Sequence, residues 1–516
     1  MSKVNLDALV PREDFDAIGN NSPGVVGDTI SISDLTSGYV YPFIRKPDFQ
    51  RETSEWDAKQ ICDFLESFLN GDLIPAIILW RSASGNYFVI DGAHRLGVLV
   101  AWIFNDYGDK DISQKFYDHD ISSDEMSIAD KARKMVNHRI GSFQDIKNSP
   151  NETAPNPAYL QRAKNMGAYK LRVQWVEGNA EKAESSFFKI NQQGVPLNKT
   201  EIKLLESRKK ANCIAARAIW KAGKGHKFWV DFSAENQSEI QRLASEINKI
   251  LFTPPLKSPV KNLHLPIAGR ISVSLPLIFD FINIVNNVPS DFNKKLLDDD
   301  NGNQTIQYLR EVRKIAWRIN SVHPSSLGLD SIVYFYNTKG QHKATSFRAV
   351  IVWVLEMQKN NSFKEFTKIR ANFEELLLKY NDMIQDIGRK LRQSIDSYYE
   401  IKDFYTECIK SLSRGNSIDA AIKEVIRTTK FSYLKMEIHS SDFHNEVTSA
   451  VIKRERKSSA FIREALETRI RCKICGARLH ENAMQVDHII REEDGGLGNE
   501  ENAQLTHPFC NSTIKN

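Results

Sequence analysis

In the first fifth of the chain the hydrophobic positions change their period several times. Apolar residues three or four apart predict a helix over 56–69, with Ser54 as its cap. Two short apolar runs follow, over 76–80 and 87–90, and each is typical of a buried strand. An apolar helix is then predicted over 96–104. This order of helix, two strands and helix indicates a small α/β core.

The pattern beyond this core is less regular. Residues 105–165 are polar and predict a loop-rich excursion. A strand over 170–176 and a helix over 180–190 follow, and from about 200 to 450 the apolar spacing is mostly helical. Residues 1–45, rich in Gly, Ser and Asp, are expected to form an arm or a sheet edge.

Composition places the chain among ordinary globular proteins. Of its 516 residues, 41% are hydrophobic and 26% are charged, enough to bury cores in several domains. No apolar run is long enough to span a membrane, and the first residues form no apolar signal segment. We therefore expect a cytoplasmic protein with no membrane partner. Since 70 basic and 65 acidic residues leave a net charge of only +5, a DNA-binding surface must be local.

Charge changes sharply near the end of the chain. Residues 452–480 hold nine Lys or Arg and three Glu, whereas 481–502 hold seven acidic residues and one Arg. The basic stretch is suited to phosphates, although such runs are often solvated helix faces. We place a domain boundary within 445–465. The predicted division is 1–205, 206–450 and 451–516.

The cysteines point to a metal. Three of the six, Cys472, Cys475 and Cys510, lie within the last 45 residues. In a chain without a signal segment, such clustering favours metal binding over disulfides. The pairs Cys472-x-x-Cys475 and His507-x-x-Cys510 can supply four ligands to a tetrahedral Zn²⁺.

Polar residues suited to phosphodiester chemistry stand between and after these pairs. They are Asp487, His488, Asn502 and Asn511, and Gly495-Gly496 lies in the segment between the two pairs. Asp and Asn offer the oxygen ligands that a hard cation needs, and an imidazole can take a proton from water near neutral pH. His480 also lies nearby, and we expect it to be an exposed bystander.

This arrangement resembles the HNH endonuclease family with a zinc knuckle over residues 471–515. The resemblance implies a ββα-metal fold in which His488 is the general base. It also implies that Asp487 and Asn511 bind the catalytic Mg²⁺ or Mn²⁺, and that Asn502 braces the loop that holds the base. The sequence departs from the family in having His507 where a cysteine is usual. The alternative is a structural zinc knuckle that binds DNA or protein without cutting.

A second motif follows the predicted strand at 87–90. Asp91-Gly92-Ala93-His94-Arg95 reads as a tight turn from a strand into a helix. Gly92 allows the backbone to bend, the free amides of the helix start suit an anion, and Arg95 can bind a phosphate. Asp91 could hold a metal or activate water. The alternative is a capped turn with no ligand.

This motif resembles the DGQQR-type domain, which has a ParB/sulfiredoxin-like core and begins GmrSD-type and SspE-type restriction nucleases. The Phe-Gln-Arg, Ile-Pro and Asn-x-x-Gly-x-x-Leu segments within residues 40–205 carry the rest of the resemblance. It implies binding or hydrolysis of a nucleoside triphosphate and sensing of modified DNA. The implied nucleotide-binding residues are Gln50, Arg51, Asp91, Gly92, His94 and Arg95. Ala93-His94 replaces the family's Gln-Gln, which weakens the case for hydrolysis more than that for phosphate binding.

Together these features predict a multidomain α+β protein with a ParB/sulfiredoxin-like core, a helical middle region and a ββα-metal domain. The predicted function is a metal-dependent DNA endonuclease, regulated by nucleotide or modified DNA in anti-phage defence. One alternative is a non-cleaving ParB-like DNA-binding or regulatory protein with a structural zinc knuckle. Another is a nuclease without modification specificity. Expected partners are DNA and a nucleotide, and the sequence leaves a homo-oligomer open.

Overall fold

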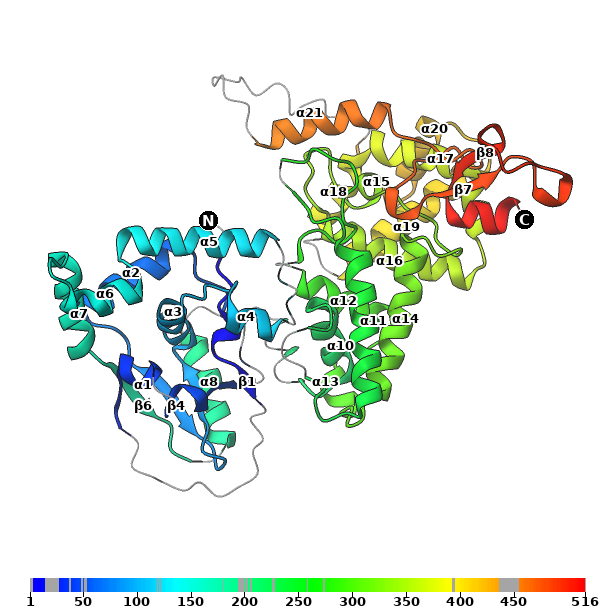
Figure 1. Cartoon of the computed structure of the whole chain (residues 1–516). Coiled ribbons are helices and arrows are strands. Elements are labelled where there is room, and N and C mark those ends of the chain that lie inside the picture. The colour runs from blue at the N-terminus through cyan, green and yellow to red at the C-terminus, as the bar shows by residue number, and fades with distance from the viewer. Residues whose placement is uncertain are drawn as a thin grey trace. The chain divides into compact units, whose positions relative to one another are not determined.

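The computed structural model has mixed α+β architecture and falls into two compact units (Figure 1). Unit 1 comprises Met1–Arg208 with Lys224–Phe228, and unit 2 comprises Lys209–Gly223 with Trp229–Asn516. The multidomain α+β fold class predicted from the sequence is confirmed. The structure describes residues 3–13, 27–36, 39–47, 50, 53–117, 119, 121, 123–178, 180–193, 200, 203–204, 207–224, 228–257, 259–271, 274–391, 395–435 and 454–515.

A mixed sheet forms the centre of unit 1. Its order is β1-β3-β5-β4-β6-β2, with β4 antiparallel to β5 and parallel to β6. The short strands β1 and β2 lie at the two edges, as expected for residues 1–45. The strands are β1 (Arg12–Glu13), β2 (Thr29–Ile30), β3 (Ile44–Pro47), β4 (Ile77–Arg81), β5 (Tyr87–Asp91) and β6 (Leu171–Trp175).

Helices surround this sheet. They are α1 (Ile32–Thr36), α2 (Ala58–Asn70), α3 (Ala93–Phe104), α4 (Asp111–Phe116), α5 (Ser123–Arg139), α6 (Phe143–Asn148), α7 (Pro157–Ala168) and α8 (Ala180–Gln193). The cap of α2 is Asp57, which forms a capping box with Gln60, so the prediction of Ser54 was wrong.

The predicted loop-rich excursion over 105–165 is also wrong, because α4 to α7 fill it. The polar composition concealed a narrow apolar face. In α5 this face consists of the buried Ala129, Ala132 and Val136, spaced three and four residues apart. Small side chains on a mostly polar helix give a weak hydrophobic signal, although they are enough to pack it against α2.

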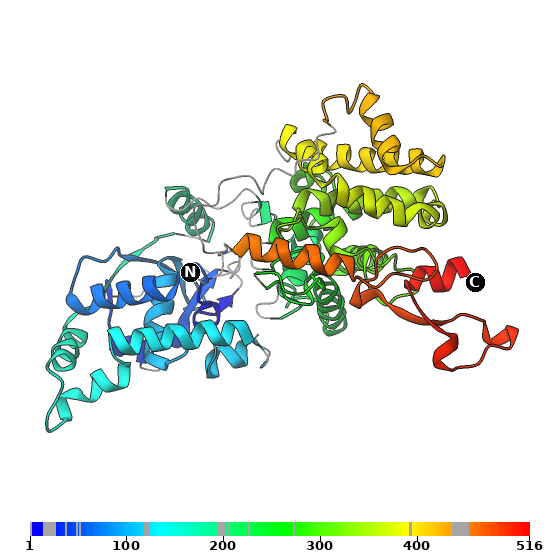
Figure 2. The ribbon, with the colours of Figure 1, turned by 90° about the horizontal axis from the view of Figure 1, so that it is seen from above.

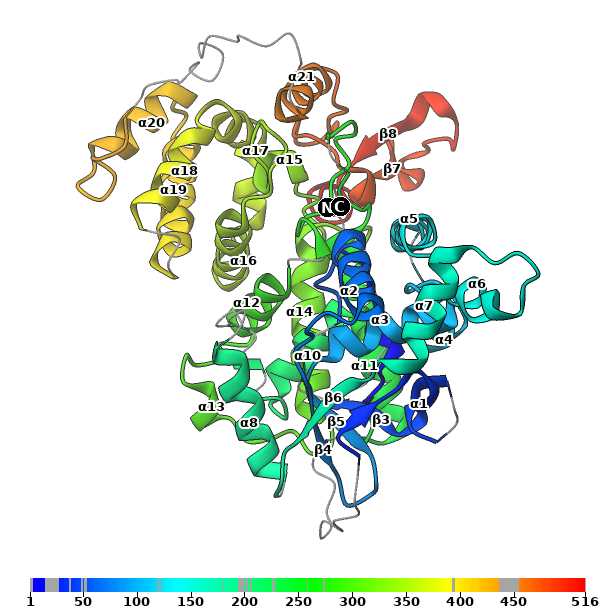
Figure 3. The same ribbon diagram turned by 90° about the vertical axis from the view of Figure 1, so that its left-hand side faces the viewer.

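Alternate residues of β4 and β5 point to opposite faces of the sheet, as the strand period requires. One face joins the main core with α2 and α3, and the other packs against α8 (Figure 3). The buried side chains are Ile77, Leu79 and Val89 on the first face and Trp80, Phe88 and Ile90 on the second. Both faces are therefore covered, and the Asp91–Arg95 turn leaves the sheet at the end of β5.

Unit 2 is mostly helical. Its long helices α11 and α14 pack side by side, as do α16 and α19 (Figure 2). Its helices are α10 (Ala211–Trp220), α11 (Ala234–Phe252), α12 (Leu275–Val285), α13 (Phe292–Lys295), α14 (Asn303–Ile319), α15 (Ser331–Tyr334), α16 (Ala344–Lys359), α17 (Phe363–Lys379), α18 (Asn381–Lys390), α19 (Ile395–Ser413), α20 (Ile418–Arg427) and α21 (Arg454–Glu467).

The chain ends in a small hairpin and one wide helical turn. Strands β7 (Gln485–His488) and β8 (Ala503–Thr506) pair antiparallel, and the π-helical turn Cys510–Lys515 follows. This end of the chain belongs to the same compact unit as the helical middle region. The predicted boundary at 445–465 lies partly outside the described residues, and the three-part division stays a prediction. Among the described residues, no helix is long and apolar enough to cross a membrane.

Candidate functional site

Three cysteines and a histidine converge at the base of the hairpin. The ligand atoms of Cys472, Cys475, His507 and Cys510 all lie within 4.8 Å of one another. His507 Nδ1 lies 3.4 Å from the Cys475 sulfur and 3.8 Å from the Cys510 sulfur. These separations are close to the edge of a tetrahedron with Zn–S bonds of about 2.3 Å, roughly 3.7 Å. The donor set therefore fits a four-coordinate soft metal.

The surroundings fix these donors. The fully buried His507 directs its Nε2–H to the Arg478 carbonyl oxygen at 2.9 Å, which leaves Nδ1 as the donor atom facing the sulfurs. Hydrogen bonds within the cysteine group lower the pKa of the Cys472 thiol and raise the pKa of the Cys475 and Cys510 thiols, so the first thiolate of the group forms at Cys472.

Residues of the helical region of unit 2 pack against the four predicted zinc ligands and the segments that carry them. Arg370 of α17 donates to the carbonyl oxygens of Leu327 and Gly328, and Glu374 accepts from the Arg478 amide at 3.0 Å. Gly328 has a φ of +59°, and a Cβ added there would lie 2.8 Å from Cδ2 of His507. The close approach explains why a glycine stands there.

The hairpin has the ββα order implied by the HNH resemblance. Asn502, at the end of the loop between the strands, is buried, and its side chain binds that loop near its start and in its middle. Its Oδ1 accepts from the Ile490 amide at 2.7 Å, while Nδ2 donates to the carbonyl oxygens of Ile490 at 3.0 Å and Leu497 at 2.8 Å. The loop begins directly after His488, so the expected bracing role has a geometric basis.

Asp487 and His488 point to different sides of β7. The Asp487 side chain is 9% exposed, and its Oδ2 accepts from Gln504 Nε2 and Lys515 Nζ, each at 2.9 Å. The His488 side chain lies on the exposed side of the strand. The carboxylate is thus held on the side of the terminal turn, and the imidazole faces solvent.

Asn511 lies on the terminal turn and also reaches β7. Its Nδ2 donates to Gln485 Oε1 at 3.3 Å. Gln485 and Asp487 are two residues apart and share one side of β7, so Asn511 and Lys515 bind the same side of the strand. The structure therefore brings the two predicted metal ligands to one surface. Sequence reasoning missed Gln485, Gln504 and Lys515, because nothing in a lone Gln or Lys signals such a contact.

His480 is not the exposed bystander that the sequence predicted. It is fully buried, its Nδ1 accepts from the Asn482 amide at 3.2 Å, and its Nε2–H donates to the Leu265 carbonyl oxygen at 3.2 Å. Burial lowers its pKa to about 4. The prediction failed because the helical region covers this histidine, which a local pattern cannot show.

The basic stretch divides into two kinds of residue. Arg456, Lys457 and Arg463 of α21 are exposed. By contrast, Arg469 forms a buried ion pair with Asp330 at 2.9 Å, and Arg478 pairs with Glu375 at 2.9 Å. Part of the stretch is therefore internal to the fold, and α21 carries its accessible charges.

In unit 1, Gly92 (φ +99°) makes the turn from β5 into α3. Arg95 donates to Asp91 Oδ2 at 2.7 Å and to the Ala76 carbonyl oxygen at 3.1 Å. The His94 ring stacks on Trp56 with centroids 5.7 Å apart. Asp91 and Arg95 thus form one ion-paired unit next to a stacked imidazole.

The structure describes Gln50 but not Arg51. Gln50 is buried, its carbonyl oxygen accepts two hydrogen bonds from Arg12, and its Oε1 has no hydrogen-bond partner among the described residues. The neighbouring Lys46, missed by sequence reasoning, is fully buried and donates to Asp7 Oδ1 at 2.7 Å. Burial lowers the pKa of Lys46 to about 8. The side chains of the Asn-x-x-Gly-x-x-Leu segment at 191–197 also lie outside the described residues.

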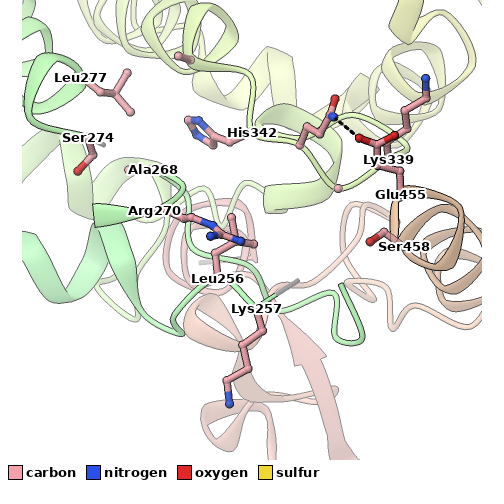
Figure 4. Close-up of a pocket in the computed structure, with 13 residues that line it drawn as sticks. Leu256, Lys257, Ala268, Arg270, Ser274, Leu277, Lys339, His342, Glu455 and Ser458 are labelled. Atoms are coloured by element: carbon pink, nitrogen blue, oxygen red, sulfur yellow. Dashed lines mark hydrogen bonds between the residues drawn. The ribbon is translucent and has the colours of Figure 1, made fainter. Parts of the chain in front are cut away.

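A cavity of about 420 Å³ lies elsewhere in unit 2, beside α21 (Figure 4). Its lining includes Arg270, Lys257 and Lys339, with Glu455 and Ser458 from α21. The two lysines extend in opposite directions, so the cavity does not gather its positive charges at one point (Figure 4). None of the residues predicted from the sequence as site residues lines it.

Comparisons with known proteins agree with both resemblances. No curated protein and no solved structure matches the chain. The family model described as GmrSD restriction endonuclease, N-terminal domain, matches residues 32–206, and that of the HNH endonuclease matches residues 472–516. The GmrSD-type fusion suspected from the sequence is thereby confirmed, and the two matches support a restriction endonuclease with a C-terminal HNH nuclease domain.

Proposed function

We propose that the protein is a Mg²⁺- or Mn²⁺-dependent DNA endonuclease whose N-terminal domain senses a nucleotide or modified DNA. The observation that carries the nuclease proposal is the shared surface of Asp487 and Asn511. Both are held on the same side of β7, by Lys515 and Gln504 in one case and by Gln485 in the other. A hairpin that bound DNA without cutting it would not need Asp487 and Asn511 on one surface next to His488.

Two metals have separate roles in this proposal. Zn²⁺ bound by Cys472, Cys475, His507 and Cys510 joins the segment before the hairpin to the start of the terminal turn, because two ligands precede β7 and two follow β8. Asp487 and Asn511 offer carboxylate and amide oxygens, which suit Mg²⁺ or Mn²⁺. A divalent cation held there would stabilise the negative charge that develops on the phosphate and leaving oxygen.

The protein's own groups supply the remaining steps. His488 takes a proton from the attacking water, and its exposed position allows a DNA strand to approach. Asn502 keeps the loop after His488 in place through its hydrogen bonds to Ile490 and Leu497. The exposed cations of α21 bind flanking phosphates, which predicts salt-sensitive binding.

For unit 1 we propose a phosphate-bearing ligand at the Asp91–Arg95 turn. Arg95 would recognise the phosphate, because its buried Nε–H has no hydrogen-bond partner among the described residues, and Gly92 would allow close approach. The buried Oε1 of Gln50 can only accept, so it would bind an N–H or O–H group of the ligand. The ligand is a nucleoside triphosphate or modified DNA, and its binding licenses cleavage by the HNH site. Such control suits an enzyme of phage defence, since unregulated cutting would damage the host.

The decisive experiment is cleavage of plasmid and of modified phage DNA with Mg²⁺ or Mn²⁺, with and without nucleoside triphosphates. Wild type is compared with His488→Ala and with His138→Ala, a change to an exposed histidine of α5. Cutting by wild type and His138→Ala but not by His488→Ala is the expected result. Tight DNA binding without cutting of either substrate would favour the non-cleaving regulatory protein instead.

A further inference from the structure

A chain of hydrogen bonds runs from the helical region of unit 2 to the predicted metal ligands. Gln485 Nε2 donates to the Val322 carbonyl oxygen at 3.0 Å, and Gln485 Oε1 accepts from Asn511 Nδ2 at 3.3 Å. Val322 belongs to the loop 321–326, which follows α14. Gln485 is half-buried and is the first residue of β7. It therefore touches both the scaffold and the site.

The chemistry of these groups permits only one orientation of both amides. A backbone carbonyl oxygen can only accept, so Gln485 must face Val322 with its NH₂ group. Its oxygen is then turned toward Asn511 and can itself only accept. Asn511 must present its NH₂ group in turn, which leaves its Oδ1 at the opposite end of the amide. Oxygen is the end that a hard cation binds.

The loop 321–326 is itself well fixed and holds the terminal turn as well. Ser326 Oγ accepts from the Ser321 amide at 2.9 Å and from the Gly328 amide at 3.2 Å. The Ser326 carbonyl oxygen accepts from the Phe509 amide at 2.9 Å, and Ser512 Oγ donates to the Pro324 carbonyl oxygen at 2.7 Å. The same loop thus binds both the strand and the turn that carry Asp487 and Asn511.

We propose that Gln485 is a positioning residue that presents the Asn511 oxygen to the catalytic cation and ties this ligand to loop 321–326. The inference rests on the proposed metal-dependent nuclease and extends it to the helical region. It predicts that cation binding depends on Gln485, because the Asn511 side chain can bind a cation through its oxygen but not through its NH₂ group. A carboxylate at position 511 has two equivalent oxygens, so it does not need this orientation.

The test is a double-mutant cycle of Gln485→Leu, Asn511→Asp and the two combined, in the full zinc-loaded chain. The readouts are Mn²⁺ affinity by electron paramagnetic resonance, without DNA, and DNA cleavage with kcat and KM separated. Zinc content and melting temperature report whether each variant folds. Gln504→Leu, which removes a donor to Asp487 instead, serves as the matched variant on the neighbouring strand.

Gln485→Leu is expected to weaken Mn²⁺ binding roughly ten-fold, the size typical of losing an outer-sphere partner, and to lower kcat more than it raises KM for DNA. In the Asn511→Asp background the same change is expected to have no effect on Mn²⁺ affinity. Because Gln504 acts on Asp487, Gln504→Leu should weaken Mn²⁺ binding in both backgrounds.

Two results would overturn the proposal. One is unchanged Mn²⁺ affinity in Gln485→Leu; the other is an equal loss in both backgrounds, which would assign Gln485 a merely structural role. Failure of the underlying nuclease proposal looks different. In that case wild type would bind no Mn²⁺, or Asp487→Ala would bind it as well as wild type.

Discussion

Arg370 and Glu374 form an ion pair at 2.8 Å with side chains only 2% and 0% exposed, and Arg370 interacts electrostatically with Cys475 and Cys510 of the predicted zinc site. Arg370 also binds the carbonyl oxygens of Leu327 and Gly328, and Glu374 accepts the amide of Arg478. The pair therefore joins α17, the loop against His507 and the segment that carries the first two cysteines. It is therefore a buried polar link between the helical region and the nuclease end.

Replacing one member of this pair should strongly destabilise the folded protein. Arg370→Met leaves Glu374 buried without its cation, and the expected loss of unfolding free energy is about 3–5 kcal/mol. Denaturant unfolding, followed with zinc release, would measure it. Arg242→Met, which removes a half-exposed ion pair with Glu239 on α11, should cost less than about 1 kcal/mol. Adding Glu374→Leu to Arg370→Met should restore part of the loss; no recovery would mean that the charge is not the cause.

The zinc site gives a second prediction. Cys475→Ala should reduce the metal content from about one zinc per chain to near zero, because three ligands hold Zn²⁺ poorly. The hairpin and terminal turn should then become accessible to protease, since metal binding and folding are coupled. Cys62→Ala, at a buried thiol in unit 1, should keep its zinc. Elemental analysis that finds full zinc in Cys475→Ala would contradict the ligand set.

A change at Asn502 tests the support of the loop without altering the predicted base, His488. Asn502→Ala removes three hydrogen bonds from the loop that follows His488. We expect faster hydrogen exchange over 489–501 and a fall in kcat of at least ten-fold, with DNA affinity little changed. Exchange and cleavage that both match wild type would show that the loop is held by other contacts.

The motifs were predictable from the sequence because they are local. The turn at Asp91 follows a strand whose apolar run is visible, and the cysteine pairs carry their own spacing. The order of Asp487, His488, Asn502 and Asn511 carried the resemblance to the HNH family, and that resemblance implied a ββα unit. In each case neighbours in sequence determine the feature.

The residues that hold the predicted site residues in place could not be predicted from local sequence patterns. Gln485, Gln504 and Lys515 acquire their roles only when β7 pairs with β8 in one register and the terminal turn packs against the strand. Arg370 and Gly328 lie far from the metal motif in sequence and meet it through tertiary packing. The burial of His480 and the helices within 105–165 were missed for related reasons, because covering segments and small apolar faces leave little local signal.

The Asp91–Arg95 unit predicts nucleotide-dependent stabilisation. If Arg95 binds phosphate, a nucleoside triphosphate should raise the melting temperature of the wild type, since a ligand stabilises the folded state that binds it. Arg95→Ala should abolish this shift, and Asp91→Ala should abolish the response of cleavage to nucleotide while leaving zinc content unchanged. Arg172→Ala, at an exposed ion pair on β6, should keep the shift. A shift retained in Arg95→Ala would remove the phosphate site from this turn.

His480 predicts how stability depends on pH. Burial is the largest cause that lowers its pKa from 6.5 to about 4; Asp330 opposes this change, and the neighbouring Arg469 contributes to it. As the pH falls below 6.5 the unfolded chain binds a proton at this residue and the folded chain does not. The neutral imidazole's contribution is therefore complete above pH 6.5 and is lost progressively down to about pH 4.

The size of this effect is at most about 3 kcal/mol, by the usual conversion of a pKa difference into free energy. His480→Asn keeps an acceptor for the Asn482 amide and removes the titration. Denaturant unfolding of both proteins between pH 7 and pH 4.5 should therefore show a smaller loss of stability in His480→Asn than in wild type. Carboxylates titrate in both proteins, so the difference between the two curves isolates His480. Parallel curves would mean that the pKa of His480 in the folded protein is close to its ordinary value of 6.5.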